Sequence, residues 1–322
     1  MSKPLKILIV RFSSIGDIIL TSPVIRNLKN QLDCEIHFLT KYKYHELLQN
    51  NPYLDNVFYL QKSILETIRE LKKEEFDYVI DLHNNLRSFF LFFLGPNIKK
   101  YNKSNFKKYL YINFGINLLK NEHVVDRYMN SVVSLGIEND HKGLDYFIGA
   151  NTSVNFDTKQ KYLAWSIGGS HIQKQLSVIQ ISKVCSQLKL PIILLGGEQE
   201  KENGEEIKKL VGNDSVINLC GQLTIDESAY IIHDSFLLLT NDTGLMHIGA
   251  ALKKTIISFW GCTKPDLGFS PYLSNDNSLE IISDRSQRQC SKHGNSCKFS
   301  DDGCVKLIDS DEIYQTLRKC LD

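Results

Sequence analysis

The sequence predicts an α/β protein built from two Rossmann-like halves in series, each with its own parallel sheet. Short β-branched runs alternate with longer segments of helical period, and the runs are apolar along their whole length. This alternation is typical of doubly wound parallel sheets, and strands this apolar suit sheets covered on both faces. A third observation, a break in the alternation between residues 139 and 161, separates the halves. A single large α/β sheet is the alternative.

The predicted elements follow in order along the chain. Strands of the first half are expected at residues 6–10, 35–39, 57–60 and 78–81. Strands of the second half are expected at residues 162–166, 192–195, 215–219, 236–240 and 255–259. Helices are expected at residues 24–31, 65–73, 176–188, 200–211, 248–252 and 311–321. The break between them is rich in glycine, asparagine and serine, which is typical of a linker. We place the domains at residues 1–155 and 156–308, followed by a C-terminal helix within 309–322.

The totals fit a globular enzyme of ordinary composition. The 322 residues suffice for two domains, with 42% hydrophobic and 23% charged residues and a net charge of +1. Such a balance does not indicate a nucleic-acid partner, so charged partners must be sought in local patches. No signal-peptide pattern opens the chain, and the longest apolar run, residues 89–94, is too short to span a membrane. Eight cysteines then fit a reducing compartment, and we expect a soluble, cytoplasmic protein.

The turn after the first strand carries a carboxylate. It reads Arg11-Phe-Ser-Ser-Ile-Gly-Asp17, and a turn of serine and glycine between strand and helix exposes N–H groups to an anion. With Gly16 as its only glycine, it is not a dinucleotide-binding motif. Asp17 could accept a proton from a sugar hydroxyl, or it could cap the first helix. The spacing favours neither role.

Two loops of the second half suit phosphate. Gly168-Gly-Ser170 is followed by Lys174, and main-chain donors with one ammonium make a cradle for a diphosphate. Asp242-Thr-Gly244 precedes a helix, whose N-terminus also favours phosphate. As alternatives, Gly-Gly is ordinary turn chemistry, Asp242 an N-cap and His247 a structural helix residue.

The stretch between Asp81 and Glu122 contains cations and no carboxylate. Its cations are Arg87, Lys99, Lys100, Lys103, Lys107, Lys108 and Lys120. Aromatic residues interleave with them, beside the apolar run at 89–94. The pattern indicates an anionic, partly apolar partner at a membrane surface. Nucleic acid stacked on the aromatics and a solvated lysine face are the alternatives.

Four soft ligands lie within fifteen residues near the C-terminus: Cys290, His293, Cys297 and Cys304. Together they could hold a structural Zn²⁺ tetrahedrally, although their spacing is not a standard finger pattern. Cys320 is a further candidate ligand, and free thiols are the alternative.

Five motifs together resemble glycosyltransferase family nine, the heptosyltransferases of lipopolysaccharide core assembly. They occupy residues 6–17, 81–87, 195–200, 218–221 and 241–247, so the resemblance covers nearly the whole chain. It implies a GT-B fold, with two Rossmann-like domains facing a central cleft and the C-terminal helix crossing back to the first domain. It also implies an inverting transfer that requires no cofactor, with an ADP-sugar as co-substrate.

The resemblance assigns roles to residues at matching positions. Asp17 would be the general base that deprotonates the acceptor hydroxyl. The donor would contact Ser170, Lys174, Glu198, Glu200, Asp242, Thr243, Gly244, Met246 and His247. Among these, Lys174 and the amides of Thr243 and Gly244 would hold the diphosphate, either glutamate the ribose, and Met246 the base. The acceptor would contact Ser13, Ser14, Gly16, Arg87, Lys99, Lys100 and Lys103.

The implied activity is transfer of a heptose, or a related sugar, to a lipid A–inner core acceptor by an enzyme peripheral to the inner face of the cytoplasmic membrane. Lys174-Gln-Leu-Ser177 departs from the Lys-Arg-Trp-Pro that the family often has after its phosphate loop. Three alternatives stay open. They are a transferase for another nucleotide sugar, a non-catalytic nucleotide-sugar-binding protein of surface polysaccharide assembly, and a nicotinamide-dependent oxidoreductase, which the loops do not favour.

Overall fold

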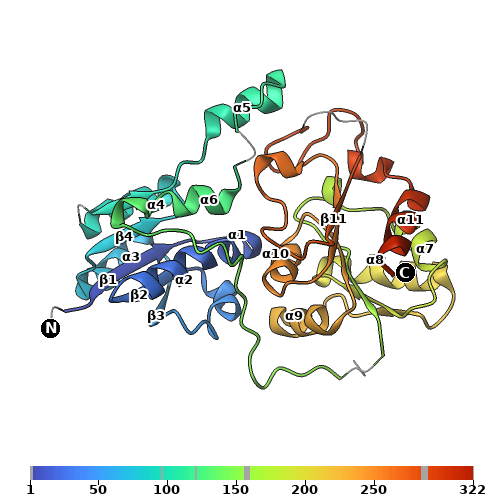
Figure 1. The fold of residues 1–322 in the computed structure, drawn as a ribbon, viewed down its shortest axis with the longest axis horizontal. Coiled ribbons are helices and arrows are strands. Elements are labelled where there is room, and N and C mark those ends of the chain that lie inside the picture. The colour runs from blue at the N-terminus through green and yellow to red at the C-terminus, as the bar shows by residue number, and fades with distance from the viewer. Residues whose placement is uncertain (1–2, 96, 120–121, 156–159, 284–288, 322) are drawn as a thin grey trace. The chain divides into compact units, whose positions relative to one another are not determined.

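The computed structural model describes residues 3–95, 97–119, 122–155, 160–283 and 289–321, and the chain divides into two compact units (Figure 1). Unit 1 comprises Met1–Lys103 and Glu122–Gly149. Unit 2 comprises Ser104–Asn121 and Ala150–Asp322. Each unit contains a parallel sheet with helices packed on it, so the predicted α/β class is confirmed.

The sheet of unit 1 has the strand order β3-β2-β1-β4-β5, and all neighbouring strands are parallel. Its strands are β1 (Leu5–Val10), β2 (Cys34–Thr40), β3 (Asn56–Tyr59), β4 (Tyr78–Asp81) and β5 (Ile98–Lys100). The expected strands are all present, and β5 is an addition. The strand order reverses between β1 and β4, and ligands of such sheets bind beyond the carboxyl ends of the strands at this point.

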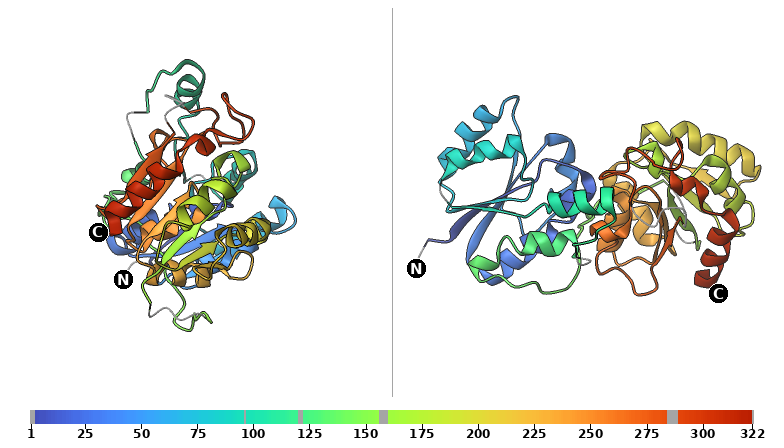
Figure 2. Two further views of the ribbon diagram at one scale, coloured as in Figure 1. Left: turned by 90° about the vertical axis from the view of Figure 1, so that its right-hand side faces the viewer. Right: turned by 90° about the horizontal axis from the view of Figure 1, so that it is seen from above.

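Helices cover both faces of the first sheet (Figure 2). One face is a core in which Leu8 and Val10 of β1 pack with Ile68 and Leu71. The unit contains α1 (Ile15–Ile19), α2 (Ser22–Gln31), α3 (Ile64–Leu71), α4 (Leu86–Phe89) and α6 (Val124–Met129). Short 3-10 turns are η1 (Tyr42–Leu47), η2 (Lys72–Glu74), η3 (Phe90–Leu94) and η4 (Val133–Leu135).

The sheet of unit 2 has the strand order β11-β10-β9-β6-β7-β8, again parallel throughout. Its strands are β6 (Leu163–Ser166), β7 (Ile192–Leu195), β8 (Val216–Asn218), β9 (Leu238–Asn241), β10 (Ile256–Trp260) and β11 (Leu279–Ile282). Here the order reverses between β6 and β9. The loops after these two strands are those predicted to bind phosphate, so the topology brings them to one edge.

The helices of unit 2 form two groups, in which α7, α8 and α11 pack together and α9 packs on α10. They are α5 (Asn105–Phe114), α7 (Val178–Cys185), α8 (Lys201–Val211), α9 (Ile225–Asp234), α10 (Gly244–Ala251) and α11 (Ser310–Leu321). The 3-10 turns are η5 (Ile172–Lys174), η6 (Glu198–Glu200), η7 (Pro265–Leu267) and η8 (Cys304–Leu307). Among the described helices, none is long and apolar enough to cross a membrane.

The division of the chain differs from the expected boundaries in two places. Unit 1 ends at Gly149 rather than at residue 155. The reason is Arg26 of α2, which forms ion pairs with Asp140 and Asp145 and so ties the start of the linker to unit 1. The segment Ser104–Asn121 belongs to unit 2 although it lies within the predicted first domain.

The C-terminal helix α11 is present where the sequence predicts it, but it belongs to unit 2. Its buried residues Ile313 and Leu317 lie in the same core as Leu163 and Trp165 of β6. Its apolar face therefore packs on the second sheet's own helix layer, and the crossing to the first domain stays a prediction.

Candidate active site

Asp17 lies in the first turn of α1, just beyond the carboxyl end of β1. Its Oδ1 is 2.8 Å from Nη2 of Arg11. Its Oδ2 accepts hydrogen bonds from the backbone N–H of Ser14 at 3.1 Å and from the Ser14 hydroxyl at 3.0 Å. Asp17 therefore does take part in capping the helix, while the same carboxylate pairs with a guanidinium at the sheet's switch point.

This environment keeps the Asp17 carboxylate charged. Burial opposes the charge, but the Arg11 guanidinium and the hydrogen bonds from Ser14 outweigh it and hold the pKa of Asp17 below its ordinary value. Arg11 is fixed in turn, because its Nε donates to the Ser13 carbonyl at 2.8 Å and its Nη1 to the Leu82 carbonyl at 2.6 Å. Since 23% of the Asp17 side chain is exposed, a ligand can still reach the carboxylate.

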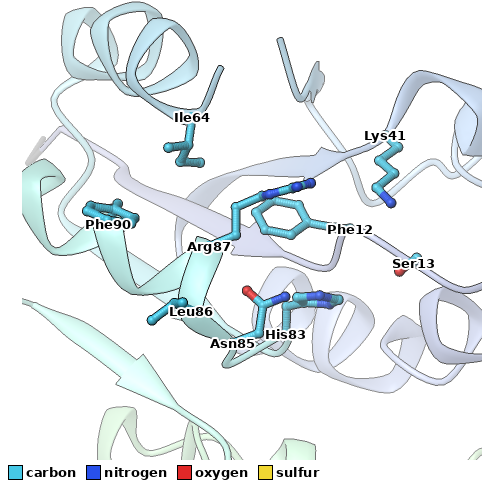
Figure 3. A pocket seen from close by; sticks show the side chains of 9 residues that line it. All are labelled: Phe12, Ser13, Lys41, Ile64, His83, Asn85, Leu86, Arg87 and Phe90. Atoms are coloured by element: carbon cyan, nitrogen blue, oxygen red, sulfur yellow. The ribbon is translucent and has the colours of Figure 1, made fainter. Parts of the chain in front are cut away.

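A pocket of about 630 Å³ lies beside this turn (Figure 3). Its polar lining consists of Ser13, Lys41, His83, Asn85 and Arg87, and its apolar lining of Phe12, Ile64, Leu86 and Phe90. Figure 3 shows the Phe12 ring between the side chains of Arg87 and Lys41 in this view. Two cations on an apolar wall suit a ligand that is both anionic and partly apolar.

His83, in the loop after β4, is held neutral. Burial is the main cause, and the nearby charges of Arg11 and Lys103 add to it, so that the pKa of His83 falls to about 3. Its ring lies 4.9 Å from that of Phe12, centroid to centroid. Within the described structure its Nδ1 is buried without a hydrogen-bond partner. The imidazole can therefore offer a neutral donor or acceptor to a ligand in the pocket.

The residues predicted for the acceptor occupy different positions around the pocket. Ser13 and Arg87 line it directly. Ser14 is engaged with Asp17, and Gly16 is buried inside α1. The three lysines lie further along: Lys99 and Lys100 on the edge strand β5, and Lys103 close enough to lower the pKa of His83.

Several residues of the pocket and of the turn around Asp17 were not among the predicted ones, and three of them have ionisable side chains: Arg11, Lys41 and His83. All three lie one or two residues beyond the end of a strand, closer to it than Ser13, Asp17 or Arg87. Their position after β1, β2 and β4 was the available signal, because carboxyl ends of adjacent parallel strands meet at one edge.

At the carboxyl edge of the second sheet, Lys174 and Asp242 form an ion pair. Nζ of Lys174 lies 2.5 Å from Oδ2 of Asp242, and the two side chains are 9% and 14% exposed. The same oxygen accepts a hydrogen bond from the Thr263 hydroxyl at 2.9 Å. The loop after β6 is thus locked to the loop after β9, and the ammonium, with three donors, can serve a second anion besides Asp242.

The N-terminus of α10 lies in the same loop as Asp242. The Thr243 hydroxyl accepts a hydrogen bond from the backbone N–H of Met246 at 3.4 Å and caps the helix. Asn241 donates from Nδ2 to the carbonyls of Ile167 and Gly168, both at 2.9 Å, and so holds the two loops together. The first-turn amides, Gly244 included, lie where the helix dipole favours phosphate.

The remaining predicted donor residues separate into exposed and buried ones. Ser170 is exposed on its loop, and Glu198 is exposed at the start of η6. Glu200 is buried, and its carboxylate accepts hydrogen bonds from the backbone of Gly197 and from Gln175. Met246 and His247 are buried within α10.

The cysteine-rich segment forms a cluster, but with a different membership from the predicted one. The thiols of Cys262, Cys290, Cys297 and Cys304 all lie within 4.8 Å of one another. His293 is exposed and is not a member of this group, whose fourth side chain is Cys262. Cys320 packs against the core of unit 2 instead.

Comparison with known proteins defines the class. The chain has the GT-B fold: a solved glycosyl transferase family 9 protein from Veillonella parvula aligns with a TM-score of 0.79 at 19% identity, over 100% of this chain and 98% of that one. The Escherichia coli heptosyltransferase WaaC with ADP aligns with a TM-score of 0.73 at 16% identity, over 98% and 100%.

Comparison of the sequence identifies the family. The pattern of glycosyltransferase family 9 (heptosyltransferase) matches residues 64–299, and the chain belongs to this family. A lipopolysaccharide heptosyltransferase 1 from Campylobacter coli is 24% identical over 98% of both chains. The resemblance drawn from the motifs is thereby confirmed, and a non-catalytic binding protein and an oxidoreductase are set aside.

Proposed function

We propose that this glycosyltransferase moves a heptose, or a related sugar, from an ADP-sugar onto an anionic lipopolysaccharide-type acceptor, with inversion at the anomeric carbon. The observation that carries the proposal is the Asp17 carboxylate, held ionised by Arg11 at the switch point of the first sheet. An ionised, partly exposed carboxylate at that position can accept a proton from a bound hydroxyl.

The reaction is a single displacement. The acceptor oxygen forms a bond to the anomeric carbon from the face opposite the leaving group, which inverts the configuration. The bond from that carbon to the β-phosphate oxygen breaks, and ADP departs with the electron pair. The hydroxyl proton passes to Asp17 while the new bond forms.

The donor binds unit 2 in this proposal. Lys174 and the first-turn amides of α10 stabilise the negative charge that grows on the diphosphate. Asp242 keeps the ammonium of Lys174 in place, since its Oδ2 lies 2.5 Å from Nζ of Lys174. Glu198 suits the ribose hydroxyls better than Glu200, because Glu200 is buried and already accepts hydrogen bonds from its own loop. The ADP bound to WaaC supports the choice of nucleotide.

The acceptor binds unit 1 in this proposal. Arg87 and Lys41 meet its phosphates or carboxylates, and the apolar wall of the pocket meets its lipid-proximal part. Next to the pocket, Leu86, Phe89, Phe92 and Phe93 are exposed, and Nζ of Lys100 lies 5.3 Å from the centre of the Phe89 ring. Exposed aromatics beside lysines suit the surface of an anionic bilayer, where the enzyme would meet its acceptor.

Turnover with Asp17→Asn tests the proposed base. We expect kcat to fall by about 100- to 10,000-fold, the usual contribution of a general base, while donor binding is unchanged. Asp33→Asn is the matched control, because Asp33 is an exposed carboxylate of the same unit. If Asp17→Asn kept turnover within about tenfold of wild type, the general-base role would be lost.

Calorimetry with ADP, UDP and GDP tests the donor. We expect ADP to bind most tightly and Lys174→Met to weaken it, whereas Lys183→Met, an exposed lysine of α7, should not. A preference for UDP or GDP would keep the transferase but remove heptose as the sugar. Mass spectrometry of the product would then identify the sugar transferred.

A further inference from the structure

Four cysteines from two parts of unit 2 converge on one point. Cys262 follows β10, while Cys290, Cys297 and Cys304 lie in the segment that leads to η8. Their Sγ atoms are 3.8 Å apart for Cys262 and Cys304, 3.5 Å for Cys290 and Cys304, 3.9 Å for Cys290 and Cys297, and 3.0 Å for Cys297 and Cys304. All four thiols lie within 4.8 Å of one another.

These separations suit a metal better than disulfides. A disulfide needs sulfur atoms about 2 Å apart, well below any of these distances. Four thiolates around a tetrahedral Zn²⁺, each with a Zn–S bond of about 2.3 Å, lie about 3.8 Å from one another. A set of four cysteines is also one of the closed ligand sets of structural zinc sites.

Main-chain donors already point at the sulfur atoms. The backbone N–H of Cys304 donates to Sγ of Cys262, and that of Phe299 donates to Sγ of Cys297, both at 3.4 Å. Such hydrogen bonds stabilise the negative charge of thiolate ligands and fix their orientation. Cys262 and Cys304 are fully buried, so a metal held by these thiols would be shielded from water.

The cysteine segment packs tightly on the loop that carries Lys174. At Gly294, φ is +74° and an added Cβ would lie 2.7 Å from Cγ and Cδ of Lys174. At Gly303, φ is +98° and an added Cβ would lie 2.4 Å from the carbonyl oxygen of Gln173. A side chain fits at neither place. The segment therefore packs closely on the side chain of Lys174 and on the backbone of Gln173.

The cluster also borders both partners of Asp242. Lys174 lies under Gly294, and Thr263, whose hydroxyl donates to Asp242, directly follows Cys262. A ligand that holds the four cysteines in place would therefore also hold the segment that packs on Lys174 and Thr263, the two partners of Asp242.

We propose that Cys262, Cys290, Cys297 and Cys304 bind one metal ion, zinc by preference, in a tetrathiolate site that holds the cysteine segment on the Lys174 loop. The metal site stands on the cluster geometry alone. Its effect on ligand binding rests on the proposed function, since it assumes that the Lys174 loop receives the donor.

Metal analysis of the purified full-length chain tests the site. We expect about one zinc per chain in wild type. Cys262→Ser and Cys297→Ser should lose it, whereas Cys320→Ser and His293→Ala should retain it, because neither residue belongs to the cluster. About one iron per chain, lost in the same two variants, would support the tetrathiolate site with iron as its ion. A wild type without metal, or variants that keep it, would overturn the proposal.

Cobalt binding to the wild-type chain tests the same site without any substitution, so a misfolded variant cannot affect the result. Wild type stripped with a chelator and titrated with Co²⁺ should show the visible bands of tetrahedral cobalt–thiolate coordination, at one equivalent. Absence of these bands in a folded protein would count against the site.

ADP binding distinguishes the metal site itself from its support of the Lys174 loop. Removal of the metal should weaken ADP several-fold and speed hydrogen exchange at residues 170–175. If the metal is present and its removal leaves both unchanged, the support of the loop is overturned and the site stands. If wild type binds metal but no nucleotide, the proposed donor site fails instead.

Discussion

Arg11 is the cation that favours the ionised form of Asp17, together with the hydrogen bonds from Ser14, although the sequence assigned Arg11 no role. Because the pKa of Asp17 in the folded protein lies below its unfolded value of about 4, the pair stabilises the fold above that value. This stability is lost as the pH falls through the lowered folded pKa. At neutral pH, Asp17 is therefore both a fully ionised base and a contributor to stability.

Arg11→Met removes the charge and keeps an apolar stem. We expect the variant to lose about 3 kcal/mol of unfolding free energy at pH 7, as for other half-broken buried ion pairs, and the loss to shrink below pH of about 4. The acid limb of kcat/KM should move to higher pH, because the pKa of Asp17 rises. Urea unfolding and a pH–rate profile measure the two effects. An unmoved acid limb would show that Arg11 does not tune Asp17.

His83 also makes stability depend on pH, but because the folded protein disfavours the charged form of its side chain. Its folded pKa of about 3 lies below the unfolded value of about 6.5, so the unfolded chain binds the extra proton first. The contribution of His83 to stability is complete above the unfolded value and is lost progressively as the pH drops from about 6.5 towards about 3. His83→Gln should remove this slope between pH 7.5 and 5.5. Equal slopes in urea unfolding of variant and wild type would contradict the assignment.

At the scale of elements, α5 lies in unit 2, whereas the expected boundary places its residues in the first half. Its cation-rich stretch was interpreted as a partner-binding surface of the first domain. In the structure Tyr111 packs with Leu119 and Leu267, and its hydroxyl donates to Asp266 at 2.7 Å. The signal was a single aromatic residue among several, and its partner lies more than a hundred residues away, so periodicity could not reveal it.

Tyr111→Ala should detach α5 from unit 2. The change removes both the apolar contact and the hydrogen bond to a carboxylate, which together hold a helix of only ten residues. Hydrogen exchange of residues 105–114 should speed up strongly, while β6 and β9 stay protected. Tyr109→Ala is the matched control on the same helix, because Tyr109 is exposed. Equal exchange in the two variants would refute the anchoring role.

The edge strands show a second limit of the sequence pattern. β5 contains only Ile98, Lys99 and Lys100, and two lysines on an edge strand look like a loop. The central strands were predictable because burial on both faces requires continuous apolar runs.

At the scale of the molecule, the two parallel sheets and the loops that carry Asp17, Lys174 and Asp242 were predictable from the alternation of strands and helices along the chain. What was not predictable depends on contacts distant in sequence. Cys262 lies 28 residues before Cys290, and only the fold brings it into the cluster in place of His293. Lys41 follows β2, far from the motifs, and reaches the pocket because β2 neighbours β1.

The distribution of charge over the whole chain leads to a last prediction. The net charge is only +1, yet the proposed acceptor pocket of unit 1 has exposed or half-exposed cations at Arg87 and Lys41, whereas Lys174 of unit 2 is buried in an ion pair. Salt screens exposed charges far more than buried ones.

Raising the ionic strength from about 0.05 to about 0.5 M should therefore raise KM for the anionic acceptor several-fold and change KM for the donor much less. Arg87→Gln should flatten the salt dependence of KM for the acceptor. Lys73→Gln, which changes an exposed lysine within η2, should leave that dependence as in wild type. If both substrates responded equally to salt, the assignment of the anionic acceptor to this pocket would fail.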